Sequence, residues 1–486
     1  MVDFTLRPDQ IEDLAACIQN PRWMLLHDPG VGKTPIACLY TWWNWDRHGR
    51  KAVWVQPLAI IKKNRDELLR FTKFDPADVV IVQGTPAQRQ AQYARKGKVY
   101  LMGADTFGRE WSDLIEHNPE IDLFVGDEWH TMYSTNDSQR TQAMYQFLRW
   151  VGPERRTLPM TGTLVRGRLN SVYSALHITE PRYYPSHDAF MNYHALLDDY
   201  GKPIMWLNVE KVAELLKRHS SRRAFEEIYG KVNAVFQTQY VEMSGEQARS
   251  YEEFAEKAVL ELEKVFLDGS MPGVNLIRAR QILSCPEIFG LCKGETTARD
   301  ALVEVHLQDH AQSGAPLIIG SASKDEQARI LKLCKKLKME AVVMNGDTSQ
   351  KQRGEYDQQF RDGTIQVMIV SPLVGAFGFN WGHVDHCIFL HLDYYADSWE
   401  QLYKRMIRGT RTRPCLIQTI VYKDTVELNV LGVLERKFAL ANEVDATKEA
   451  VRLITPKPET PSGGNENRTP QKRTGVGLLP LPKKRA

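Results

Sequence analysis

The sequence lacks a long hydrophobic run. A helix that spans a membrane needs roughly 18 or more consecutive apolar residues. The longest candidate, residues 367–379, is interrupted by Ser371, Pro372, Gly375 and Gly378. The N-terminal stretch MVDFTLRPDQ also lacks the basic and apolar segments of a secretory signal. The sequence therefore predicts a protein without a membrane span that stays inside a cell.

Cysteine is scarce and shows no pairing pattern. The chain has 7 cysteines among 486 residues, an odd number, and none of them forms a C-x-x-C pair. This spacing argues against a disulfide framework and against a structural zinc site. Cys334 lies in an apolar pattern of helical period, so we expect it to be a small core residue.

An excess of charge of one sign is missing as well. The chain has 63 Lys and Arg against 60 Asp and Glu, a net charge of +3. Residues 455–486 alone carry +5, so the residues before them sum to −2. Bulk charge therefore gives no argument for nucleic-acid binding. Hydrophobic residues make up 43% of the chain, which is enough to build a core, and the length predicts two or more folded units.

Short apolar or β-branched runs alternate with segments of helical period. This alternation is typical of parallel sheets covered by helices, an α/β fold. It predicts two lobes, residues 1–190 and 293–454, joined by a mainly helical segment, 191–292. The basic tail 455–486, rich in Pro and Gly, is predicted to be disordered. The predicted strands are 23–26, 52–56, 79–83, 99–103, 122–126, 157–161, 316–320, 340–345, 365–371, 386–392 and 416–421.

A glycine-containing loop follows the first predicted strand. It reads His-Asp-Pro-Gly-Val-Gly-Lys-Thr over residues 27–34 and leads into an apolar helix start. Glycines let backbone N–H groups turn toward a triphosphate, Lys33 reaches its β and γ phosphates, and the Thr34 hydroxyl ligates magnesium. The strict eight-residue motif has glycine where His27 stands, but the shorter form G-x-G-K-T fits.

Two adjacent carboxylates, Asp127 and Glu128, end the apolar run 122–126. Such a pair divides the work of hydrolysis: one carboxylate holds magnesium, and the other orients and deprotonates the attacking water. Taken alone, the pair is more simply a charged end of a strand. The order of the neighbouring motifs decides in favour of the chemical interpretation.

Further motifs stand in a fixed order around these two. On this order the sequence resembles the superfamily 2 motor ATPases, specifically the Swi/Snf-like branch, in a compact bacterial or viral form. The likeness covers about residues 3–440. It implies two RecA-like lobes, ATP and Mg²⁺ as cofactors, and nucleic acid as partner. The motifs are Leu-Arg-Pro-Asp-Gln at 6–10, Asp-Glu-Trp-His at 127–130, Thr-Gly-Thr at 161–163, Arg-Arg at 222–223, Gly-Phe-Asn at 378–380 and residues 401–409.

The resemblance assigns roles to matching positions. Gln10, with Arg7 beside it, would bind the adenine, and the loop residues Asp28, Pro29, Gly30, Val31, Gly32, Lys33 and Thr34 would bind phosphate. Asp127 with Thr34 would hold the metal, and Glu128 would be the catalytic base. The coupling residues would be His130, Thr161 and Thr163. The far lobe would contribute Gly378, Asn380, Gln401, Arg405 and Arg408.

The two arginines also fit the chemistry independently. A guanidinium stabilises the charge on a phosphoryl group in transfer, an effect worth about 10³ to 10⁵ in rate. Arg405 and Arg408 are spaced i, i+3 on a predicted helix, so they share one face.

The resemblance leaves the substrate and its processing open. The favoured interpretation is a nucleic-acid-stimulated ATPase that moves on double-stranded DNA, and the alternative is a helicase that separates DNA or RNA strands. A third is an adaptor that binds ATP without hydrolysing it. A cytoplasmic location follows for a bacterial or viral protein, and a nuclear one for a eukaryotic protein with this basic tail, which could also bind a protein partner. Candidate nucleic-acid contacts are Lys62, Thr106, Arg166 and Ser371.

Overall fold

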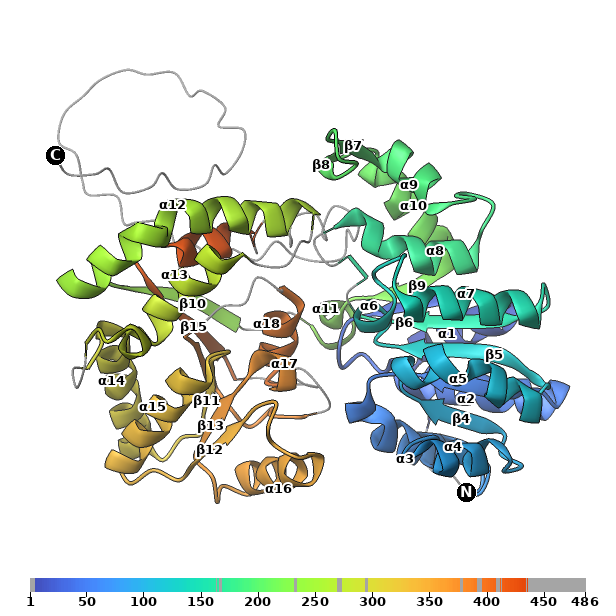
Figure 1. Cartoon of the computed structure of the whole chain (residues 1–486). Coiled ribbons are helices and arrows are strands. Elements are labelled where there is room, and N and C mark those ends of the chain that lie inside the picture. Colours follow the sequence, from blue (N-terminus) through green and yellow to red (C-terminus); the bar gives the residue numbers. More distant parts are fainter. Residues whose placement is uncertain are drawn as a thin grey trace. The chain divides into compact units, whose positions relative to one another are not determined.

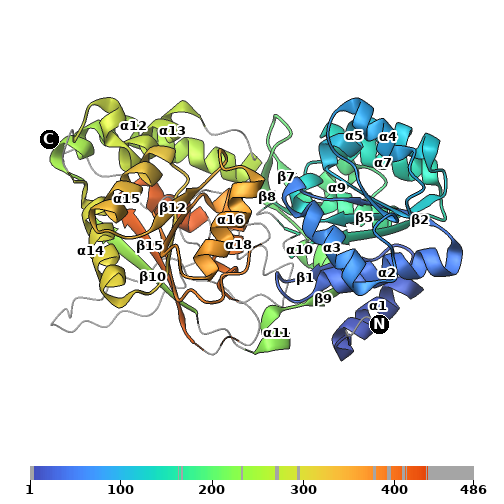
Figure 2. The ribbon, with the colours of Figure 1, turned by 90° about the horizontal axis from the view of Figure 1, so that it is seen from below.

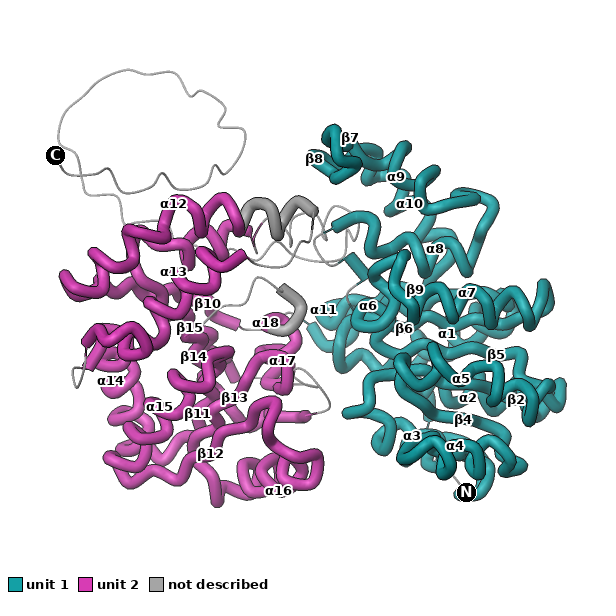
Figure 3. Tube along the Cα trace, viewed as in Figure 1, with its two compact units in different colours: residues 1–232, 440–449 teal, residues 233–439, 450–486 magenta. Residues whose placement is uncertain are grey.

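The computed structural model has two compact units, which divide between residues 232 and 233 (Figure 3). Both are α/β units built on a parallel sheet. No helix in the described part of the chain is long and apolar enough to cross a membrane. The described residues are 5–162, 164–165, 168–230, 234–268, 273–292, 296–375, 379–390, 396–407, 411, 413–433 and 435. For residues 262–268 and 396–398 only the backbone is described.

The first unit is built on a seven-stranded parallel sheet in the order β3-β4-β2-β5-β6-β1-β9. A separate antiparallel hairpin, β7 with β8, belongs to the same unit. The strands are β1 (Met24–His27), β2 (Lys51–Val55), β3 (Val79–Ile81), β4 (Val99–Met102), β5 (Ile121–Asp127), β6 (Arg156–Met160), β7 (Ala195–Leu197), β8 (Pro203–Trp206) and β9 (Ser220–Arg223).

Helices cover both faces of this sheet, with α4, α5 and α7 on one side and α1, α2 and α3 on the other (Figure 2). Because the strands are buried on both faces, they read as continuous apolar runs. The helices are α1 (Pro8–Gln19), α2 (Lys33–His48), α3 (Ile61–Phe71), α4 (Pro86–Tyr93), α5 (Ala104–His117), α6 (Trp129–Met132), α7 (Gln139–Val151), α8 (Tyr173–Thr179), α9 (His187–His194), α10 (Val209–His219) and α11 (Phe225–Tyr229), with 3-10 turns at Leu58–Ile60 and Leu169–Val172.

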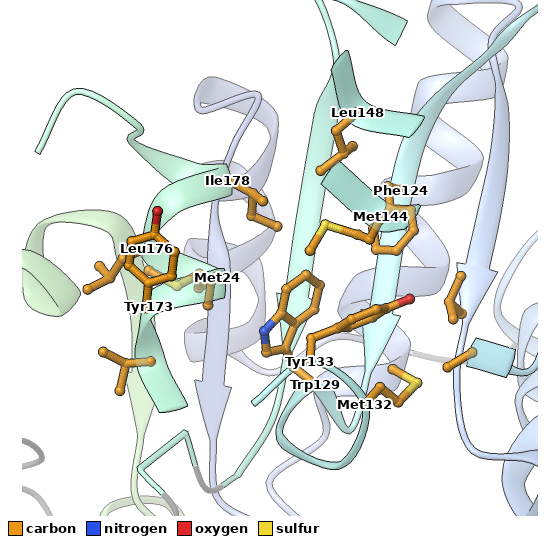
Figure 4. Close-up of a cluster of buried hydrophobic side chains, with 14 of the residues drawn as sticks. Met24, Phe124, Trp129, Met132, Tyr133, Met144, Leu148, Tyr173, Leu176 and Ile178 are labelled. Atoms are coloured by element: carbon orange, nitrogen blue, oxygen red, sulfur yellow. The ribbon is translucent and has the colours of Figure 1, made fainter. Parts of the chain in front are cut away.

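The core of the first unit follows the two-residue period of its strands. Phe124 of β5 packs into the cluster on the α5 and α7 face, whereas Leu123 and Val125 pack on the opposite face. On the first face, Trp129 and Tyr133 lie against Phe124, with ring centroids 6.2 Å from it (Figure 4). This packing fixes the short helix α6 directly after the acidic end of β5.

The second unit has a six-stranded parallel sheet in the order β10-β15-β14-β11-β13-β12. Figures 1 and 2 show α14 and α15 on one face of it and α16 and α18 on the other. The strands are β10 (Ala234–Val241), β11 (Leu317–Gly320), β12 (Ala341–Met344), β13 (Val367–Val370), β14 (His386–Phe389) and β15 (Cys415–Tyr422). The helices are α12 (Gly245–Asp268), α13 (Val274–Ser284), α14 (Ala298–Ser313), α15 (Lys324–Lys336), α16 (Gln350–Arg361), α17 (Pro372–Gly375) and α18 (Ala396–Tyr403), with a 3-10 turn at Pro286–Phe289.

Local sequence sets many of the helix ends. Ser349 caps α16 and Thr85 caps α4, each paired with a glutamine three residues later in a capping box. Helix α2 ends at Gly49, whose φ of 63° suits glycine. The capping residues therefore define where these helices begin or end, which the spacing of apolar residues alone does not determine.

The structure confirms the predicted pair of parallel-sheet lobes and each predicted strand. It differs within 191–292, which is helical over most of its described length but also contains the strands β7, β8, β9 and β10. β7 pairs with β8 in the hairpin. β9 pairs with β1 and β10 with β15, so each of these two is an edge strand of its sheet. The sequence at β9 is Ser-Ser-Arg-Arg, which gives no apolar signal. Residues 455–486 lie outside the described part of the chain.

Candidate active site

The loop between β1 and α2 has the backbone geometry of a phosphate-binding loop. Gly30 and Gly32 have φ angles of 89° and 96°, a region that favours glycine. Gly32 is the N-cap of α2, and as a glycine it has no side chain that could cap the first N–H groups of the helix. The first N–H groups of the helix can therefore bind an anion. Lys33 Nζ donates a hydrogen bond to the His27 carbonyl oxygen at 3.0 Å, so the ammonium group folds back across the loop.

The start of α1 lies against the same loop. Arg7 Nη2 donates to the Val31 carbonyl at 2.6 Å, and Gln10 Nε2 donates to the Gly32 carbonyl at 3.1 Å. Gln10 Oε1 accepts the Arg7 N–H at 3.0 Å, so both ends of this buried amide are bonded within the chain. A Cβ on Gly32 would lie 2.6 Å from Gln10 Nε2. Arg7 and Gln10 thus hold the loop in shape, and their contact with adenine stays a prediction.

A buried network of charged and polar side chains contacts His27, the residue at which the loop begins. His27 is fully buried, and its Nε2 lies 3.2 Å from Asp13 Oδ2. Arg223 of β9 donates to both oxygens of Asp13, at 3.2 and 2.9 Å. Burial lowers the pKa of His27, against the opposing effect of Asp13. Burial alone would raise the pKa of Asp13, but hydrogen bonds from His27 and Arg223 outweigh it and lower that pKa. An ionised Asp13 therefore ties α1, β1 and β9 together.

The segment after β9 is also attached to the loop. The Asp28 N–H donates to the Arg223 carbonyl at 3.0 Å, and Asp28 Oδ2 accepts the Phe225 N–H at 3.1 Å. The Tyr229 hydroxyl accepts a hydrogen bond from Arg7 Nη1 at 3.4 Å. Asp28, predicted from its place in the motif, thus has a clear role in joining the loop to α11.

The predicted acidic pair lies at the carboxyl end of β5. Asp127 is 6% exposed, and both of its carboxylate oxygens accept hydrogen bonds. Oδ1 accepts the Glu128 N–H at 3.0 Å, and Oδ2 accepts Asn64 Nδ2 at 2.8 Å. Glu128 has a φ of 54°, a left-handed conformation that costs a non-glycine residue about 1–3 kcal/mol and that clusters at functional sites. The pair is therefore held in one orientation.

Two of the predicted coupling residues meet beside this pair. His130 Nδ1 lies 2.6 Å from Thr161 Oγ1 and 3.6 Å from Glu128 Oε2. The Thr161 N–H donates to the carbonyl of Leu25, in the strand that leads into the phosphate loop, at 3.1 Å. These contacts connect the acidic pair with that loop. The coupling role itself stays a prediction, and Thr163 lies outside the described residues.

Sequence reasoning missed two side chains of this site, Asn64 and Gln56. Asn64 is on α3 and donates both to Asp127 and to Gln56 Oε1, beyond the end of β2. A signal for Asn64 was available in the sequence. The buried face of α3 is formed by Ile61, Asn64, Leu68 and Phe71. A polar residue at a core position of an amphipathic helix needs a hydrogen-bond partner.

Thr34 and Asp127 suit magnesium rather than a dedicated metal cage. Among the described residues, no group of three or more His, Cys, Asp and Glu side chains could hold a metal ion. Mg²⁺ in ATPases usually takes one or two protein oxygens and completes its shell with water and phosphate oxygens. Thr34 lies in the first turn of α2, directly after Lys33 of the phosphate loop. The donor set therefore fits a magnesium–nucleotide complex.

The predicted residues of the far lobe belong to the second unit. Gln401 in α18 and Arg405 just after it are 4% and 6% exposed. The Arg405 carbonyl accepts the Trp381 N–H at 2.8 Å, which fixes the turn that carries the arginine. Asn380 is exposed. Their part in an active site stays a prediction, and two partners lie outside the described residues: Gly378 and Arg408.

The candidate nucleic-acid contacts follow the carboxyl ends of strands. Lys62 is exposed in the first turn of α3, after β2, and Thr106 is half-buried in the first turn of α5, after β4. Ser371 follows β13, and its carbonyl accepts the Gly375 N–H at 2.9 Å. In open α/β sheets, ligands bind at this edge. Arg166 lies outside the described residues, and all four contacts stay predictions.

Comparison with protein families adds the decisive observation. An SNF2-related domain matches residues 12–285, which is more than half of the 486 residues, and a helicase conserved C-terminal domain matches residues 297–413. The chain belongs to the SNF2-related family. This SNF2-related protein is an ATP hydrolase of superfamily 2, a translocase of the Swi/Snf type that works on nucleic acid. The predicted family, enzyme class and cofactor ATP are thereby confirmed.

Solved structures give a more distant likeness. The SNF2-related chain is similar to the Sulfolobus solfataricus SWI2/SNF2 ATPase core, a structure in complex with double-stranded DNA. The two are 17% identical, the match covers 92% of this chain and 95% of that one, and the TM-score is 0.42. No curated protein sequence matches the chain significantly.

Proposed function

We propose that this SNF2-related ATPase hydrolyses magnesium-bound ATP at the carboxyl edge of its first sheet and uses the cycle to move along double-stranded DNA. One observation carries the proposal. The phosphate loop with Lys33 and the acidic pair Asp127 and Glu128 are built into the same sheet edge, and the His130–Thr161 contact joins them. The family match supports a motor that acts on nucleic acid.

The first unit supplies the groups for hydrolysis. Lys33 and the backbone N–H groups of the loop bind the β and γ phosphates, and Thr34 and Asp127 hold the metal. Bound Mg²⁺ supplies charge that stabilises the phosphate oxygens in the transition state. Glu128 orients the attacking water and takes its proton. In this proposal, the contact of Glu128 with His130 couples this base to Thr161 and, through Thr161, to bound nucleic acid.

The second unit supplies the remaining charge. In this proposal Arg405 and Arg408 stabilise the phosphoryl group in transfer, a contribution of about 10³ to 10⁵ in rate. Gln401, Gly378 and Asn380 complete the contact with the nucleotide. Hydrolysis in this proposal therefore requires residues of both units, and this requirement couples it to movement.

The carboxyl edges of the two sheets also supply the nucleic-acid contacts. Lys62 and Thr106 of the first unit, and Ser371 of the second, would bind backbone phosphates, which requires no excess of positive charge over the whole chain. Arg166 would belong to the same path, and the basic tail 455–486 would bind nucleic acid or a partner protein. If phosphates dominate, the logarithm of affinity falls with that of salt concentration with a slope of about −0.9 per phosphate contacted.

The direct test is the rate of ATP hydrolysis by the full-length protein, titrated with duplex DNA, single-stranded DNA and RNA at equal nucleotide concentration. The proposal expects the largest stimulation from the duplex, with Lys33→Ala inactive under every condition. Stimulation by single strands alone would favour a strand-separating helicase. No stimulation by any nucleic acid would overturn the proposed function.

A further inference from the structure

Helix α3 holds the predicted metal carboxylate from outside its own strand. Asn64 of α3 is 2% exposed, and its Nδ2 lies 2.8 Å from Asp127 Oδ2. The other oxygen of Asp127 accepts the Glu128 N–H. Two hydrogen bonds from two directions fix the plane of the carboxylate, so its orientation does not depend on the metal ion.

Asn64 is itself oriented by a second amide. Residues Val55 and Gly126 are in register between β2 and β5, so the next residues, Gln56 and Asp127, are neighbours at the sheet edge. Gln56 is fully buried, and its Oε1 accepts a hydrogen bond from Asn64 Nδ2. An asparagine amide nitrogen carries two N–H donors, one for each acceptor, and a carboxylate in its place has none. The amide of Asn64 therefore meets both acceptors, which a carboxylate at this position could not do.

A second residue of α3 lies near the predicted magnesium ligands. Burial raises the pKa of Glu67, the Asp127 carboxylate adds to this rise, and Lys63 and the Thr34 hydroxyl oppose it. Glu67 Oε1 is 3.7 Å from Lys63 Nζ. Asn64 and Glu67 are spaced i, i+3, so both lie on one face of α3.

We propose that Asn64 is a positioning residue of the magnesium site: it holds Asp127 in the orientation that receives the metal–nucleotide complex. The inference rests on the proposed role of Asp127 and adds a residue to it that no catalytic motif named above contains. Partners that orient metal ligands in other proteins typically contribute about 10- to 100-fold in metal affinity. We expect an effect of this size at Asn64.

The chain offers a matched control in Asn44. This asparagine of α2 is also fully buried, and its Nδ2 donates to Asp122 Oδ1 at 2.9 Å. Asp122 lies on β5 as well, but near the amino end of the strand, away from Asp127. Asn44→Ala and Asn64→Ala therefore remove the same kind of bond from the same strand. Only the second bond is at the proposed metal site.

The experiment measures binding of a fluorescent ADP analogue to full-length wild type, Asn64→Ala, Asn64→Leu and Asn44→Ala. Each protein is titrated with Mg²⁺, and the affinity without Mg²⁺ is measured in EDTA. Asn64→Leu keeps the side-chain volume and serves if the alanine variant is poorly folded, which a thermal melt reports. The half-saturating Mg²⁺ concentration is expected to rise about 10-fold or more in both Asn64 variants. It should be unchanged in Asn44→Ala, and affinity in EDTA should be equal in all four proteins.

Two outcomes would overturn the positioning role. One is a folded Asn64 variant with the same Mg²⁺ dependence as Asn44→Ala. The other is an equal loss of affinity with and without Mg²⁺, because that loss would reflect general damage to the nucleotide site. A third outcome has a different meaning. If the nucleotide affinity of the wild type did not depend on Mg²⁺, the proposed magnesium-dependent function would be refuted, and the role of Asn64 with it.

Discussion

The two units have the same kind of parallel sheet but use their buried polar side chains differently. In the first, a chain of contacts at the carboxyl edge of the sheet runs from Asn64 through Asp127, the half-buried Glu128 and His130 to Thr161. In the second, two charged residues are almost fully buried: Arg299 of α14 is 1% exposed and Glu326 of α15 is 0% exposed. The chain of contacts in the first unit lies beside the residues that are predicted to bind phosphate and metal. Arg299 and Glu326 in the second unit are instead bonded to other side chains of the same unit.

Arg299 joins three separate parts of the second unit. Its Nη2 donates to Glu427 Oε1 at 2.6 Å, and its Nη1 donates to Glu326 Oε1 of α15 at 3.3 Å. The guanidinium also lies 4.5 Å from the centre of the Tyr422 ring. Burial raises the pKa of Glu326, and Arg299 opposes this rise. These contacts fasten α14, α15 and the end of β15 to one another.

The contrast separates two uses of a buried polar group. A buried ion pair adds little net stability over an apolar core, but it is costly to break on one side only. In the second unit, the free-energy cost of separating Arg299 from its carboxylate partners keeps the helices packed in one arrangement. In the first unit the hydrogen bonds orient side chains of the proposed active site, so a change there should alter chemistry more than stability.

The strongest test of this contrast is Glu128→Gln in the first unit. Loss of the proposed catalytic base should lower kcat by about 10² to 10⁴, while affinity for ATP and the melting temperature stay close to those of wild type. Steady-state hydrolysis, equilibrium ATP binding and a thermal melt measure the three quantities. Equal hydrolysis by wild type and variant would show that Glu128 is not the base.

In the second unit, Arg299→Met should have the opposite profile. It leaves the buried carboxylates of Glu326 and Glu427 without their cation, which should lower the free energy of unfolding by about 3–5 kcal/mol. The triple variant with Glu326→Gln and Glu427→Gln should recover part of this loss. Hydrogen exchange during urea unfolding locates the effect, and equal loss of protection in both units would contradict the assignment.

A smaller effect is expected from acid. Burial is the main cause that lowers the pKa of His386 to about 4, and its Nδ1 lies 2.9 Å from His310 Nε2. The unfolded chain binds a proton at this histidine near pH 6.5, so between these values it binds more protons than the folded chain. The contribution to stability is therefore complete above pH 6.5 and falls as the pH drops toward 4, by about 3 kcal/mol.

The check on this acid effect is His386→Gln, which has no proton to gain. Urea unfolding of the second unit, measured from pH 7 to pH 4, should have a shallower dependence on pH in the variant than in wild type. An identical slope in the two proteins would mean that another group controls the loss.

Much of the fold could be predicted because burial on both sheet faces leaves continuous apolar runs. Trp54 and Val125, for example, are in strands that are apolar almost throughout. Two of the four edge strands of the two described parallel sheets, β9 and β10, were not predicted. β9 is formed by polar residues, and its place depends on pairing with β1. The hairpin of β7 and β8 gave no turn signal strong enough to separate it from the helices around it.

The motif residues of the site could be predicted because their chemistry restricts the residue type. Gly32 must be glycine for its φ and for its contact with Gln10, and Lys33 and Asp127 follow from binding phosphate and metal. Their supports could not be predicted in the same way. Asn64 and Asp127 are 63 positions apart, and only the folded sheet brings them together.

The central claim is that the loop with Lys33 binds the phosphates of ATP. Its most direct test compares the affinity for ATP of two variants: Glu128→Gln alone, and Glu128→Gln combined with Lys33→Ala. The Glu128 background prevents hydrolysis, so binding is measured at equilibrium with magnesium present. Removing the charge-assisted hydrogen bonds of Lys33 should weaken ATP binding by about 10-fold or more. An unchanged dissociation constant would contradict the claim that this loop binds the phosphates.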